Sequence, residues 1–303
     1  MADRLVPIVF AIFIWWFSTG VVILLDGLPH RTFRWSLVIS SAVAVGAIMG
    51  LAHTASQTTV SGAYCAFTCA LLLWGWHELS FLTGWITGPR KMGHTQGCSR
   101  WRQALQAIQV ILWHELWLLL SLSLLAALTW NQPNQVGLWT FAVLWCMRAS
   151  AKLNLFLGVR NLGLEFLPSH LGYLQHYFRQ APLNLLMPLS ITASTVIVVC
   201  LVQGAVAAPP GSAAATGSLL LATMLAMGVL EHWLLVLPLN PSALWRWAMR
   251  GHRRAAEPFE LAKPHDEPVT GTSLTSTPKA LPGAVGHQHR LQNDEDLLRA
   301  RSA

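Results

Sequence analysis

The sequence predicts an all-α integral membrane protein, a bundle of about seven transmembrane helices. Its 303 residues are 53% hydrophobic and only 11% charged, whereas soluble domains carry roughly 25% charged residues. Trp occurs 15 times and Tyr only 3 times, and Trp is enriched at membrane interfaces. Apolar runs long enough to cross a bilayer, about 20 residues, recur along the chain. So few charged side chains cannot cover a water-facing surface of this size.

Seven apolar windows are predicted to span the membrane. They cover residues 5–26, 36–56, 61–86, 104–129, 136–158, 184–207 and 215–238. The first window contains Trp15, Trp16 and Phe17, and no small-residue cleavage site follows it. We therefore expect a retained span there rather than a signal peptide.

Basic residues predict the orientation of these spans. The first, third and fifth connections carry Arg or Lys, the second, fourth and sixth carry none, and the tail begins with Arg246 and Arg250. By the positive-inside rule the N-terminus is periplasmic and the C-terminus cytoplasmic. The net charge of +7 is concentrated in these loops, so it indicates anionic lipid headgroups as the partner rather than nucleic acid.

Two segments differ from the spans. The fifth connection, near 165–182, has Leu167, Leu171 and Leu174 at helical spacing, so an interfacial segment is expected there. Residues 251–303 are polar and rich in Pro, Gly, Ser and Thr, which predicts a disordered cytoplasmic tail. The chain is thus divided into a transmembrane domain over 1–250 and that tail.

Histidine and glutamate stand side by side inside three of the apolar windows. The word WHEL occurs at 76–79 and again at 113–116, and EHW at 231–233. In the predicted topology each pair lies about 10–15 Å from the cytoplasmic ends of the spans. A charged residue inside a span costs at least about 2.5–3.5 kcal/mol, so such residues are candidates for function. The candidate ligands of a metal or cofactor are His77, Glu78, His114, Glu115, Glu165, His170, Glu231 and His232, and the candidate binding residues are Arg148, Lys152 and Asn154.

Three interpretations of this layer are open. In the first, imidazoles and carboxylates bind iron, manganese or zinc, with one residue of each adjacent pair as ligand and the other orienting a neighbour. In the second, one histidine ligates the magnesium of a chlorin or the iron of haem. In the third, Glu78, Glu115 and Glu231 neutralise Arg148, Lys152 and Arg160, and the histidines are hydrogen-bonded partners.

Other kinds of site are not indicated. The sequence has no P-loop, dinucleotide fingerprint or nucleophile elbow. Its five cysteines include no pair with zinc-finger or redox spacing.

Four stretches of the chain resemble a known family. They are IWWFSTGVVILLDGLPHRTFRWS, WGWHELSFLTGWITGPRK, KLNLFLGVRNLGLEFLPSHLGYLQHYF and EHWLLVLPLNPSALWRWA. Together they are similar to the photosynthetic complex assembly protein 2 family, also called PuhE, from about residue 10 to about residue 250. The resemblance implies a protein that accompanies the reaction-centre H subunit and helps reaction-centre and light-harvesting complexes to assemble. It supplies no catalytic residues.

We therefore expect a multi-pass assembly factor of the bacterial inner membrane, cytoplasmic or intracytoplasmic. Its expected partners are reaction-centre or light-harvesting subunits, other assembly factors and lipid, but no nucleic acid. It would handle bacteriochlorophyll at His77, His114 or His232. The alternative is an enzyme: a membrane-embedded His/Glu metal-dependent oxidoreductase with one or two non-haem iron ions, acting on a lipophilic, pigment-like substrate.

The positions of the side chains distinguish these expectations. Four imidazoles within about 5 Å of one point, each near a carboxylate, favour metal. Glutamates that contact Arg148 and Lys152, with the imidazoles apart, favour the ion-pair interpretation. A flat apolar slot beside one histidine favours a macrocycle.

Overall fold

The computed structural model describes residues 2–95, 97–237, 239 and 241–249, and all of them belong to one unit of the chain. The tail predicted from residue 251 lies outside the described residues. The described chain is helical, and its β-type contact is an isolated bridge between Val159 and Gln180. The elements in this part are α1 (Ala2–Asp26), α2 (His30–Thr54), α3 (Val60–Leu82), α4 (Arg100–Leu128), α5 (Val136–Leu157), η1 (Leu164–Phe166), η2 (Ser169–Tyr177), α6 (Leu186–Ala207), α7 (Ala213–Leu234) and η3 (Pro241–Trp245), where η marks a 3-10 helix.

Within the described residues, six helices are long and apolar enough to cross a membrane: α1, α2, α3, α4, α6 and α7. They indicate a multi-pass membrane protein. The remaining α-helix, α5, has 22 residues and carries Arg148 and Lys152. The seventh span and the orientation of the termini stay predictions.

Local capping determines where the helices begin and end, and the apolar windows missed these points by several residues. Helix α2 begins at His30, directly after Pro29, rather than at residue 36. Helix α3 ends at Leu82 rather than 86, because Gly84 takes a left-handed backbone with φ +77°. Helix α4 begins at Arg100, since the preceding Ser99 accepts a hydrogen bond from a first-turn amide.

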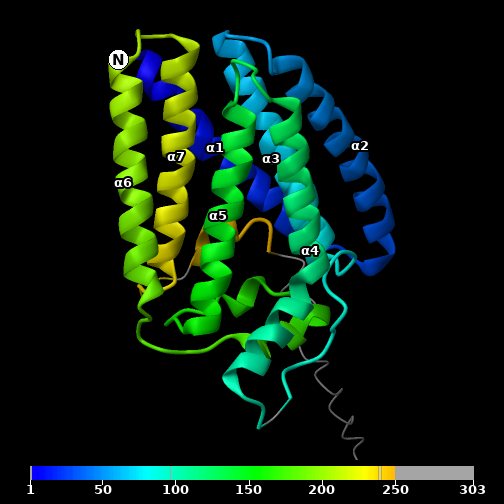
Figure 1. The fold of residues 1–303 in the computed structure, drawn as a ribbon. Coiled ribbons are helices and arrows are strands. Elements are labelled where there is room, and N and C mark those ends of the chain that lie inside the picture. The colour runs from blue at the N-terminus through cyan, green and yellow to red at the C-terminus, as the bar shows by residue number, and fades with distance from the viewer. Residues whose placement is uncertain (1, 96, 238, 240, 250–303) are drawn as a thin grey trace, which may run out of the picture. The chain divides into compact units, whose positions relative to one another are not determined.

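Three helices form the centre of the unit. Helix α3 packs against α1, α2, α5 and α7, and helix α7 packs against α1, α3, α5 and α6. Figure 1 shows α6 beside α7, and α2 on the other side of the unit beside α3. Helix α5 is in contact with α3, α4 and α7, so its polar residues face the helices that carry the three His-Glu pairs.

The chain after α7 turns back and packs against α1, as the orange segment of Figure 1 shows. The indole of Trp16 donates to the carbonyl of Leu244 at 3.0 Å, and the indole of Trp245 donates to the carbonyl of Trp16 at 3.0 Å. A Cβ atom at Gly20 would lie 2.1 Å from the ring of Trp247, so only glycine permits this approach. The apolar pattern of the sequence does not show this return.

The fifth connection contains η2, a 3-10 helix. Its Leu171 and Leu174 are buried in one cluster with Phe81 of α3 and Val110 of α4. The apolar side of the segment is therefore covered by protein. Its predicted place at the membrane interface stays a prediction.

The connection between α3 and α4 inserts its backbone against α4. The amide of His114 donates to the carbonyl of Thr87 at 2.9 Å, an acceptor outside its own helix. A Cβ atom at Gly88 would lie 2.0 Å from the carbonyl oxygen of Gln109. A group inserted into the hydrogen-bond ladder is a common cause of helix bending, and Figure 1 shows the first part of α4 inclined to the rest.

Candidate functional site

The two glutamates of the repeated WHEL form ion pairs with the two cations of α5. Glu78 Oε2 lies 3.0 Å from Arg148 Nη2, and Glu115 Oε1 lies 2.6 Å from Lys152 Nζ. The pairs join α5 to α3 and to α4. Because both cations are balanced by carboxylates, their insertion into an apolar environment is compensated.

The helical period of α5 explains how one helix reaches both neighbours. Trp145, Arg148 and Lys152 follow one another at steps of three and four residues, so they share a face. The indole of Trp145 donates to Glu115 Oε2 at 3.3 Å. The ammonium of Lys152 also lies 5.8 Å from the centre of the Phe81 ring, a cation–π distance.

Two of the three predicted span histidines are tied by hydrogen bonds. His77 is buried, and its Nε2 lies 2.8 Å from the hydroxyl of Ser121 on α4. His232 is also buried; its Nδ1 donates to the carbonyl of Gly228 at 2.9 Å, and its Nε2 lies 2.8 Å from the hydroxyl of Ser150. These imidazoles therefore connect α3 to α4 and α7 to α5.

His114 differs from both. Its side chain is 1% exposed, yet neither ring nitrogen has a hydrogen-bond partner among the residues that the structure describes. Its ring centre lies 4.6 Å from that of Phe81 and 6.4 Å from that of His77. A buried polar group without a partner is unfavourable by about 1–3 kcal/mol, so it calls for an explanation.

Glu231 and Asn154 are the remaining candidate residues on the helices. Glu231 of α7 is not in either of the two ion pairs found within the described ranges. Asn154 is buried and donates to the carbonyl of Ser150 at 3.0 Å. We call Glu78, Glu115, Arg148 and Lys152, together with His77, His114, Glu231 and His232, the polar layer.

The two predicted loop residues do not join the polar layer. His170 donates through Nε2 to the carbonyl of Leu82 at 2.7 Å and contacts the ring of His30, with 5.3 Å between centres. Glu165 is exposed on η1. Nearby in η2, burial raises the pKa of the Tyr173 phenol.

The geometry of the polar layer favours the ion-pair interpretation among the three. Both glutamates of the WHEL words contact the cations of α5, and His77 and His232 bond to separate hydroxyls. No group of three or more His, Cys, Asp or Glu that could hold a metal ion occurs in the described part of the chain. Metal binding at these residues stays a prediction.

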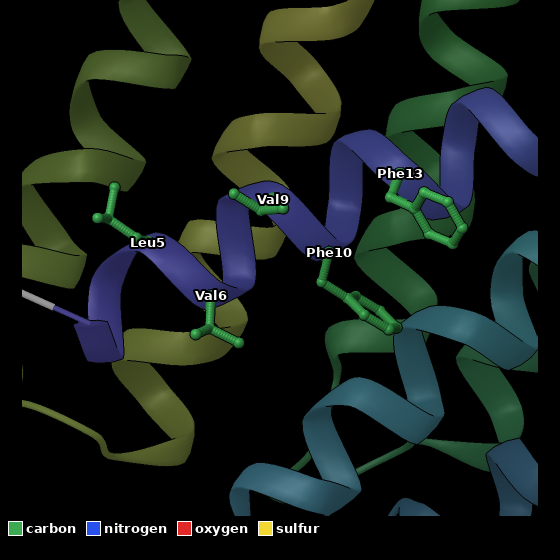
Figure 2. A pocket seen from close by; sticks show the side chains of 5 residues that line it. All are labelled: Leu5, Val6, Val9, Phe10 and Phe13. Atoms are coloured by element: carbon green, nitrogen blue, oxygen red, sulfur yellow. The ribbon is translucent and has the colours of Figure 1, made fainter.

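An apolar hollow lies elsewhere, on α1. It measures about 380 Å³ and is lined by Leu5, Val6, Val9, Phe10 and Phe13, as Figure 2 shows. It contains no residue of the polar layer and no polar side chain. The lining of this hollow therefore offers apolar contacts.

Three hydroxyl and backbone partners were missed by sequence reasoning. Ser121 lies seven residues after His114, hence on the same face of α4, and this spacing was a usable signal. Ser150 of α5 pairs with a histidine 82 positions away, and no local pattern indicates such a partner. Thr87 contacts α4 through its backbone carbonyl, and the amino-acid type at this position does not indicate such a contact.

Comparison with known proteins gives one family and one relative. The family described as "Protein of unknown function (DUF3623)" matches residues 1–256. The chain is 38% identical over 262 residues to the "Uncharacterized 30.4 kDa protein in puhA 5'region" of Rhodobacter capsulatus, covering 85% of this chain and 95% of that protein. No solved structure matches the chain.

Proposed function

This chain belongs to the DUF3623 family, and we propose that it is a non-enzymatic assembly factor of the bacterial photosynthetic membrane that holds a bacteriochlorophyll at His114. It would be located in the bacterial inner membrane, either the cytoplasmic or the intracytoplasmic membrane. Its partners would be reaction-centre or light-harvesting subunits.

The genetic context of the relative supports the photosynthetic role. The name of that protein places it in the puhA 5' region of Rhodobacter capsulatus. The four stretches that resemble the assembly protein 2 family point to the same context. Both relations extend over most of the chain, so the proposal concerns the whole transmembrane unit.

The ion pairs support a structural role for most of the polar layer. Glu78 and Glu115 are engaged by Arg148 and Lys152, which leaves few carboxylates for acid–base chemistry. In a bilayer, helices gain little from hydrophobic association, and interhelical polar contacts fix their arrangement. A rigid helix arrangement is what a protein needs to present a constant surface to client subunits.

The single observation that carries the pigment assignment is the state of His114. The magnesium of a chlorin needs one ring nitrogen with a lone pair. Both nitrogens of His114 lack a partner in the described residues, whereas His77 and His232 are engaged. The ring of Phe81 packs against His114, with 4.6 Å between the ring centres, so a macrocycle would have to take the place of this apolar ring. When bound, the pigment supplies the magnesium, and His114 supplies the nitrogen that orients it.

The test is purification of the full chain in mild detergent from a pigmented strain. We expect bacteriochlorophyll in the purified protein, its loss in His114→Ala, and its retention in the control variant His53→Ala, at a loop-proximal histidine of α2. Reaction-centre or light-harvesting subunits should co-purify with all three. Recovery of neither pigment nor subunits in repeated preparations would contradict the proposal.

The metal-dependent oxidoreductase is the rival outcome of the same preparation. No observation within the described residues favours it, since the imidazoles do not share a point. Non-haem iron at a stoichiometric level, lost in His114→Ala, would overturn the pigment assignment and favour the enzyme.

A further inference from the structure

Helix α4 is longer than the membrane it crosses. Its 29 residues make about 43 Å at 1.5 Å per residue, and the hydrocarbon core is about 30 Å thick. The part that follows Gln109 is about 28 Å long by the same measure and is sufficient to span. The first ten residues, Arg100–Gln109, are therefore in excess of the span; we call them the α4 arm.

The inserted connection separates the arm from the span. The backbone of Gly88 meets the carbonyls of Gln109 and Val110, and the carbonyl of Thr87 accepts from His114. These contacts lie where the excess length ends. The arm is consequently free to take an inclination different from that of the span, as Figure 1 shows.

One side of the arm is apolar and uncovered. Trp101, Leu105 and Ile108 are exposed, Trp101 by 73%, and their steps of four and three residues place them on one face. In the span, Trp113, Leu116 and Leu120 are exposed as well, and they face lipid if α4 crosses the bilayer. The opposite side of the arm is covered, because Ala107 packs on the cluster of Leu171 and Leu174 from η2.

The charges of the arm identify its partner. Arg100 and Arg102 flank Trp101 and are exposed, and the acidic side chains Asp and Glu are absent from residues 83–114. Cationic residues beside a Trp and an apolar stripe are typical of helices at the membrane surface. We infer that the α4 arm binds anionic phospholipid, with its apolar stripe among the acyl chains and its two arginines at the phosphates. This inference does not depend on the proposed function.

Depth measurement tests the arm in the full chain. The five native cysteines are replaced by Ala, and single cysteines at positions 105 and 108 carry a nitroxide in vesicles of phosphatidylcholine and phosphatidylglycerol in equal amounts. We expect their collision ratio of oxygen to a water-soluble nickel complex to be several-fold higher than at Arg102→Cys and Gln109→Cys, the exposed positions beside the stripe. Equal ratios place the stripe in water, and protection from both reagents places it against protein; either result overturns the inference.

The lipid charge is tested by a second label. A fluorophore at position 105 should be quenched about twofold or more by brominated phosphatidylglycerol relative to brominated phosphatidylcholine. Arg100→Gln with Arg102→Gln should remove that preference, whereas Arg31→Gln with Arg34→Gln, a matched pair in α2, should keep it. A preference that survives the first pair contradicts the assignment of the phosphates to these arginines.

Discussion

The polar layer and the contact between α1 and the returning C-terminal segment hold helices together in different ways. In the polar layer, charges and hydroxyls on α3, α4, α5 and α7 pair across the helices. At α1, two indoles exchange hydrogen bonds with backbone carbonyls, and the ring of Trp247 fills the space above Gly20.

The difference shows which contacts in a membrane depend on charge and which on shape. Removing one charge of a pair leaves its partner unbalanced in an apolar environment, and the loss is large. Adding one methyl group where two surfaces meet forces them apart, and this overpacking lowers the stability of the fold. Both contacts can therefore be tested by paired substitutions that separate the contact from its neighbours.

The largest effect is expected at the ion pair of Glu115 and Lys152. Lys152→Met leaves the carboxylate without its cation and should lower the free energy of unfolding by about 3 kcal/mol. In the double variant with Glu115→Gln and Lys152→Met, neither member of this pair is charged, so most of the lost stability should be recovered. Denaturation in mixed detergent micelles measures both. A double variant whose loss equals the sum of the two single losses would show that the pair is not coupled.

A smaller effect is expected at Gly20. Gly20→Ala places a Cβ atom 2.1 Å from the Trp247 ring and should cost about 2 kcal/mol in the same assay, because the ring must move. In a Trp247→Ala background the same substitution should cost nothing. Gly46→Ala on α2 is the matched control, since a methyl group added there would meet no atom within 4 Å. Equal losses in both backgrounds would place the effect elsewhere than at the indole.

The smallest effect is expected at Ser121. Ser121→Ala removes the partner of His77 Nε2 and should lower stability by about 1 kcal/mol, the usual effect of a lost hydrogen bond. Ser123→Ala is the control, because its hydroxyl bonds to the carbonyl of Leu119 in its own helix. If both variants unfold alike, the hydrogen bond between α3 and α4 contributes nothing measurable.

The sequence predicted the helices well and their ends less well. Apolar length reveals spans because the bilayer requires it, and six of the seven windows coincide with helices that meet that requirement in the described residues. The ends of the helices depend on single capping residues such as Ser99 and on the left-handed Gly84. The return of residues 241–249 depends on shape at Gly20, which composition does not encode.

The candidate site was predictable to the extent that charge is rare in a membrane. Glu78, Glu115, Arg148 and Lys152 stood out because their insertion is unfavourable, and the structure pairs them. Which cation meets which carboxylate depends on helix rotation and neighbour choice, and one chain's residue pattern fixes neither. The separation of His170 from the polar layer follows from the path of the fifth connection, which the helical spacing of its leucines does not determine.

The hydrogen bonds between Trp16 and the C-terminal segment join residues 228 and 229 positions apart. A ribosome adds about 5–20 residues per second, so α1 waits roughly 10–45 s for this partner to be made. The helical unit is thus completed only after residue 245 has been made, and a chain that stops before Leu244 leaves its first helix without these contacts.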